Sequence, residues 1–84
     1  MNIIERDLLY QIITNQSFAE YIIQRIDVGD FDDEVANQIY SAIIDLLYQG
    51  KPISKQTLLK YFYHKGPVDS KLVHFISKNL LLSV

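Results

Sequence analysis

The sequence predicts an all-α domain, a compact bundle of about five short helices. Apolar residues recur at helical spacing along nearly the whole chain, and no segment shows sustained strict alternation of apolar and polar residues. Caps and helix breakers separate these apolar runs, and the connections are only a few residues long. Residues 1–84 are therefore expected to form one helical-bundle domain.

The first two helices have similar start signals. Asn2 is the predicted N-cap of the first, with Glu5 as its capping-box partner, and Ser17 with Glu20 repeats this spacing for the second. A short turn at residues 27–30 follows. The apolar residues expected to face the core are Ile4, Leu8 and Ile12 in the first helix, with Leu9 and Ile13 beside them, and Phe18, Ile22, Ile23 and Ile26 in the second.

The third predicted helix spans about residues 32–49 and forms the centre of the bundle. Ala36 and Ala42 are small enough to let another helix approach closely. Gly50 is placed to follow the last helical turn, and Pro52 lies where a helix cannot continue. Its central apolar residues are Ile39, Ile43, Leu46 and Leu47.

Two further helices complete the prediction. Ser54 caps the fourth, which ends at Gly66 and Pro67, and either Asp69 or Ser70 opens the fifth. Their apolar residues are Leu58, Leu59 and Phe62 in the fourth helix and Leu72, Val73, Ile76 and Leu80 in the fifth.

An acidic cluster at the start of the third helix has two interpretations. Asp30, Asp32, Asp33 and Glu34 surround Phe31 and resemble a metal site in composition, but a calcium loop needs a ligand and glycine spacing that is absent here. Acidic side chains are also favoured at a helix N-terminus, where they interact with unpaired N–H groups. We interpret the carboxylates as a helix start, with Phe31 packing on the first turn as a hydrophobic staple.

The sequence offers little for catalysis. His64 and His74 lie on different predicted helices with no acidic residue at ligand spacing, the chain has no cysteine, and its three glycines are isolated at turns. We therefore expect no catalytic, cofactor-binding or metal-binding residues, no small-molecule substrate and no enzyme activity from this chain by itself.

Charge is divided unevenly along the chain. Residues 1–50 carry two arginines against nine acids, a balance of −7, whereas residues 51–84 carry six lysines against one aspartate, a balance of +5. This polarity bears on partner choice and orientation. The longest apolar runs are three residues and no signal peptide is recognisable, so no membrane association and a cytoplasmic location are expected.

A small DNA-binding domain is an alternative of another class. Residues 54–79 fit a helix–turn–helix arrangement with lysines at positions 55, 60, 65, 71 and 78. The same region has no arginine, the residue most often used for bidentate base contacts, and lysines commonly occupy a solvated helix face. Direct contact with nucleic acid is therefore not expected for this domain.

Apolar residues away from the predicted core faces indicate a protein-interaction surface. Ile3 and Tyr10, seven residues apart, project from the side of the first helix opposite its predicted core face, and Phe75 and Leu82 repeat this spacing. Such residues either complete a small core or contact a partner. The candidate partner-binding residues are Ile3, Tyr10, Tyr48, Tyr63, Phe75 and Leu82.

Residues 5 to about 62 resemble a helical domain shared by two partners in bacterial replication. One is the C-terminal helicase-binding domain of bacterial primase, and the other is the N-terminal domain of the replicative hexameric helicase. The resemblance is closer to primase, because the helicase version tends to carry a Glu-Gln pair that is absent at Glu5-Arg6. The positions that carry the resemblance are Glu5, Leu8-Leu9, Asp30-Phe31, Ile39-Tyr40, Gly50, Pro52-Ile53 and Leu58-Leu59.

The resemblance implies a non-catalytic module of primase, itself a DNA-directed RNA polymerase, that contacts the N-terminal domain of the replicative helicase and modulates it at the replication fork. The alternative is the helicase's own N-terminal domain, which associates with copies of itself and with primase. Since residues 80–84 stay apolar without a stop signal, we expect a fragment of a larger protein that lacks the C-terminal helical hairpin of the primase domain.

Overall fold

The computed structural model describes residues 3–67 and 69–79, and every regular element in them is helical. The five α-helices confirm the predicted all-α class. In chain order the elements are α1 (Ile3–Thr14), α2 (Gln16–Ile22), the 3-10 turn η1 (Val28–Asp30), α3 (Glu34–Tyr48), α4 (Lys55–His64), α5 (Ser70–His74) and the π-helical turn η2 (Phe75–Asn79).

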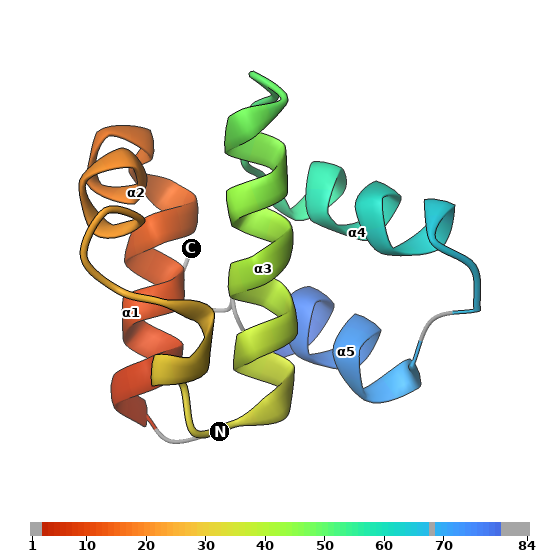
Figure 1. The fold of residues 1–84 in the computed structure, drawn as a ribbon. Helices are drawn as coiled ribbons and strands as arrows, with labels where there is room; N and C mark the ends of the chain where they lie inside the picture. Colours follow the sequence, from red (N-terminus) through yellow and green to blue (C-terminus); the bar gives the residue numbers. More distant parts are fainter. Residues whose placement is uncertain (1–2, 68, 80–84) are drawn as a thin grey trace.

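The helix α3 stands at the centre of the fold (Figure 1). The helices α1 and α2 pack against each other on one side of it, and α4 and α5 lie on the other side. Contacts also join α1 to α3, α3 to α4, α3 to η1, and α4 to η2. Six of the fifteen buried apolar residues of the described chain belong to α3, as a central helix requires. None of the helices described is long and apolar enough to span a membrane.

The buried residues form one cluster that draws on every helix. Ala36 and Ala42 are fully buried, as predicted for small positions that allow close helix packing. Because buried apolar area is the main stabilising contribution to a small domain, this cluster determines how the helices are arranged. Its members are Leu9, Ile12, Ile13, Ala19, Ile22, Phe31, Ala36, Ile39, Tyr40, Ala42, Ile43, Leu46, Leu58, Leu72 and Ile76.

The orientation of α1 differs from the prediction. Ile4, expected in the core, is 76% exposed, whereas Leu9, Ile12 and Ile13 are buried. Near Ile4, the backbone N–H of Asp32 donates a long-range hydrogen bond to Glu5 Oε2 at 2.7 Å, which joins the start of α1 to the segment before α3.

The caps are partly as predicted. Ser54 caps α4 with Thr57 as its capping-box partner, and Gly50 follows α3 with a φ of 71°, a left-handed conformation that favours glycine. The prediction for α2 is wrong, because Asn15 caps it by accepting from the N–H of Phe18 at 3.1 Å, and Ser17 lies inside the helix.

The last predicted helix is shorter than expected. Asp69 is its N-cap, accepting from the N–H of Lys71 at 2.9 Å, and the α-helical part ends at His74, where η2 begins. Leu72 and Ile76 are buried as predicted. Asn2, Leu80 and Leu82, for which the sequence predicted a cap, a core position and an interface position, lie outside the described residues.

Candidate functional site

The carboxylates before α3 serve as caps of successive helical segments. Asp33 is the N-cap of α3 and accepts from the N–H of Ala36 at 3.1 Å. Asp30 Oδ2 accepts from the N–H of Asp27 at 2.9 Å and closes the turn η1. Within the described part of the chain, no group of three or more His, Asp or Glu side chains is arranged to hold a metal ion. The acidic stretch is therefore a structural start of α3.

Asp33 gives the stability of the fold a pH dependence. The hydrogen bond from the Ala36 N–H lowers the pKa of the Asp33 carboxyl below its ordinary value. A carboxyl with a lowered folded-state pKa stabilises the fold above its unfolded pKa and loses that contribution as pH falls through the folded pKa. The expected stabilisation is therefore present at neutral pH and lost in acid.

We expect Asp33→Ala to lower the free energy of unfolding by about 1 kcal/mol at neutral pH, because the cap acceptor is removed. Asp33→Asn keeps an acceptor and is the matched control, with a smaller loss. Urea unfolding measured from neutral to acid pH checks both variants, and the gap between wild type and Asp33→Ala should narrow as pH falls below the ordinary aspartate range. A gap that is independent of pH would contradict the capping role.

Phe31 was predicted to pack on the first turn of α3 as a hydrophobic staple, but it packs further along that helix. Its ring is buried and lies 5.0 Å from the ring of Tyr40, two turns into the helix. The Tyr40 hydroxyl donates to the carbonyl of Ile26 at 2.6 Å, and burial raises the pKa of Tyr40, with the charges of Asp27 and Asp30 adding to the shift. These contacts attach the segment between α2 and α3 to the central helix.

The predicted partner-binding residues occupy different parts of the molecule. Ile3 begins α1 and is 63% exposed, Tyr48 ends α3 and is 82% exposed, and Tyr63 in the last turn of α4 is 60% exposed. Figure 1 places the start of α1 and the end of α3 at opposite ends of the molecule. Tyr10 and Phe75 are half-buried and pack against the core. The structure thus does not gather these residues into one patch.

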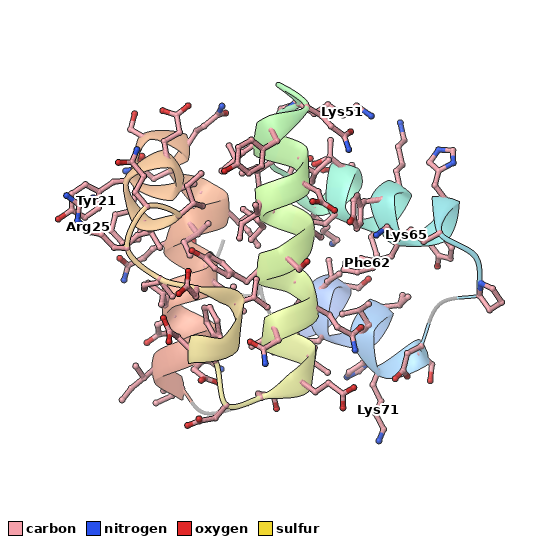
Figure 2. The ribbon with its side chains drawn as sticks, viewed as in Figure 1. Tyr21, Arg25, Lys51, Phe62, Lys65 and Lys71 are labelled. Carbon is pink, nitrogen blue, oxygen red and sulfur yellow. The ribbon has the colours of Figure 1, made fainter. Side chains whose placement is uncertain are left out.

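Two exposed apolar residues were missed by the sequence analysis. Ile4 stands beside Ile3 at the start of α1, and together they form what we call the α1 apolar pair. Tyr21 on α2 is half exposed and its ring is covered by the guanidinium of Arg25, 3.6 Å from the ring centroid (Figure 2). The exposure of Ile4 depends on the rotation of α1, which no local signal in the sequence reveals.

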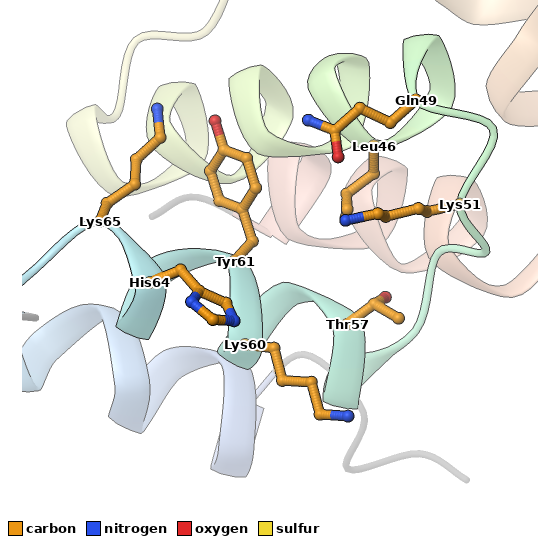
Figure 3. A pocket seen from close by; sticks show the side chains of 8 residues that line it. All are labelled: Leu46, Gln49, Lys51, Thr57, Lys60, Tyr61, His64 and Lys65. Atoms are coloured by element: carbon orange, nitrogen blue, oxygen red, sulfur yellow. The ribbon is translucent and has the colours of Figure 1, made fainter.

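A groove lies between the end of α3 and α4 (Figure 3). Its volume is about 320 Å³, and we call it the basic groove because three lysines line it, Lys51, Lys60 and Lys65. Its lining also includes Leu46, Tyr61 and His64. The Tyr61 hydroxyl donates to Asp45, and burial, together with this bond, raises the pKa of Tyr61. The Lys65 ammonium lies 4.7 Å from the Tyr61 ring centroid. Hydrogen bonding to the Tyr61 side chain raises the pKa of Lys65.

Titratable side chains elsewhere do not form a recognisable catalytic arrangement in the described residues. His64 lies in the last turn of α4 and His74 at the end of α5, both exposed. Tyr61 and Asp45, two titratable side chains joined by a hydrogen bond, both belong to the contact between α3 and α4. The exposed apolar side chains and the basic groove are surface features that suit binding.

Comparison with known proteins adds one family. The family model described as "DnaB-like helicase N terminal domain" matches residues 2–81, nearly the whole chain. No curated protein and no solved structure gives a match. The match agrees with the helicase side of the resemblance in the sequence.

Proposed function

The chain belongs to the DnaB-like helicase N-terminal domain family, and from this premise we propose that it is the N-terminal interaction domain of a replicative helicase. In this proposal it associates with copies of itself and with primase, in the bacterial cytoplasm at the replication fork. It has no catalytic activity by itself, and the chemistry belongs to other domains of the helicase and to primase.

The family match supports the helicase alternative more than the primase interpretation that the sequence analysis preferred. Primase origin is not confirmed, and it stays a second candidate because the Glu-Gln pair typical of the helicase version is absent at Glu5-Arg6. In that candidate the chain contacts the helicase N-terminal domain instead of forming part of it. Both candidates are protein-interaction modules of DNA replication.

The proposed mechanism is differential binding. A primase that binds one arrangement of the helicase N-terminal domains more tightly than another shifts the helicase toward that arrangement. The free energy available for this shift is the difference between the binding free energies of primase for the two arrangements. Each of these depends on the surfaces that this domain exposes. The uneven charge, −7 in residues 1–50 and +5 in residues 51–84, would orient the encounter.

The observation that carries the proposal, beside the family match, is the α1 apolar pair. Ile3 and Ile4 are adjacent, large and exposed by 63% and 76%. Exposing two neighbouring branched aliphatic side chains to water is unfavourable in free energy, and burying them in a protein interface is favourable. We propose that a second copy of the domain covers them.

We expect the double substitution Ile3→Ser and Ile4→Ser to weaken self-association at least tenfold, because it removes the apolar area that the contact buries. Sedimentation velocity over a concentration series measures the association. Gln11→Ser, an exposed position on the same helix, is the matched control and should leave association unchanged. Circular dichroism checks that the double variant keeps its helices.

Two outcomes would count against this proposal. A wild-type chain that sediments as a monomer at all concentrations would exclude self-association through this domain. A double variant that associates as tightly as wild type would exclude the α1 apolar pair as the contact.

A further inference from the structure

The basic groove combines an apolar surface with several cations. The half-buried Tyr61 ring supplies most of the apolar part, because Leu46, although it lines the groove, is only 3% exposed. Lys51 extends from the loop after α3, Lys60 extends from α4, and Lys65 follows the last residue of α4 (Figure 3). An apolar surface bordered by cations suits a ligand with apolar and acidic groups together.

The lysines of the groove are available to a ligand. Among residues 3–67 and 69–79, no carboxylate forms an ion pair with Lys51 or Lys60. Asp45, the acid nearest to the groove's Tyr61, is engaged by the Tyr61 hydroxyl. The charge of Lys51 and Lys60 is therefore not balanced within the described chain.

We propose that the basic groove binds an acidic segment of a partner protein, with an apolar side chain of that segment on the Tyr61 ring and its carboxylates on Lys51 and Lys60. The proposal deepens the proposed function and rests on it, since it names the chemistry of a segment through which a protein partner docks. Docking of short segments in grooves with a few anchoring side chains is a common recognition mode.

Single-stranded nucleic acid fits the groove less well. Residues 51–84 contain no arginine, and the whole chain has a net charge of −2. An acidic peptide brings an aliphatic side chain for the Tyr61 ring together with carboxylates for the lysines.

The test is a nuclear magnetic resonance titration of the 84-residue chain with a short synthetic peptide of alternating glutamate and leucine. Saturable shifts of the Gln49, Lys51 and Tyr61 amides are expected. Lys51→Glu and Lys60→Glu should each weaken binding about fivefold or more, because each reverses a charge beside the bound carboxylates. Lys71→Glu is the matched control on α5, far from Lys51 in Figure 2, and should change binding less than twofold.

Three results would overturn the proposal. The first is that a lysine–leucine peptide binds as tightly as the acidic peptide and shifts the same amides. The second is that oligothymidine binds there more tightly than the acidic peptide. The third is that the Lys51→Glu and Lys60→Glu variants bind the acidic peptide as tightly as wild type. If one of these occurs while the Ile3 and Ile4 substitutions still weaken self-association, only the groove proposal fails. If self-association is also absent, the proposed function fails with it.

Discussion

Ile12→Ala is expected to lower the free energy of unfolding by about 3 kcal/mol. Ile12 is fully buried on α1, so the substitution removes buried methyl groups and leaves a cavity in the core. A domain of this length has a total stability of about 4–13 kcal/mol, so the loss is a large part of it. Urea unfolding followed by circular dichroism measures the change.

Ile4→Ala is the matched control for this prediction, because it makes the same substitution on the same helix. Ile4 is 76% exposed, and its truncation should change the free energy of unfolding by less than about 0.5 kcal/mol. The sequence alone predicts similar losses at both positions, since both were expected to face the core. Equal losses at the two positions would contradict the exposure of Ile4.

Tyr40→Phe is expected to lower the free energy of unfolding by about 1–2 kcal/mol. The substitution keeps the ring against Phe31 but leaves the carbonyl of Ile26 without its hydroxyl donor. The raised pKa of Tyr40 adds a second signature. A group with a raised folded-state pKa stabilises the fold below its unfolded pKa and loses this contribution as pH rises through the folded pKa, so wild type should weaken in strong alkali more than Tyr40→Phe does.

Tyr48→Phe makes the same chemical change at an exposed site and should leave stability unchanged within about 0.5 kcal/mol. Thermal unfolding of the two variants at neutral pH, followed by an alkaline series, compares them directly. A Tyr40→Phe protein as stable as wild type would mean that the hydroxyl does not hold the segment between α2 and α3.

Local signals in the sequence predicted most of the helix ends. Ser54, Gly50 and Asp69 act within one helical turn of their own positions, so their roles depend little on the rest of the fold. The start of α2 was missed because Asn15 and Ser17 are both good caps, and the choice between them depends on where α1 ends.

The rotation of α1 could not be predicted in the same way. Apolar residues lie on two sides of this helix, so its periodicity fits more than one buried face. The choice depends on how α1 packs on α2 and α3, and the contact of Glu5 with the N–H of Asp32, 27 positions later in the chain, accompanies that packing. Such a contact leaves no local pattern in a single sequence.

The candidate interface, too, could be predicted from the sequence only in part. The exposure of Ile3 fits the prediction from its spacing with Tyr10, but Tyr10 itself packs against the core, because a small domain has few other residues to complete it. The basic groove was not predicted, since Leu46, Lys51 and Tyr61 meet only after α4 packs on α3. The role of the six candidate residues in partner binding stays a prediction.

Calorimetric titration of the 84-residue chain with the helicase-binding domain of primase from the same organism tests the central claim most directly. If the chain is the N-terminal interaction domain of a replicative helicase, the titration should show saturable binding with micromolar affinity. No heat of binding at high micromolar concentrations of a folded chain would contradict the claim.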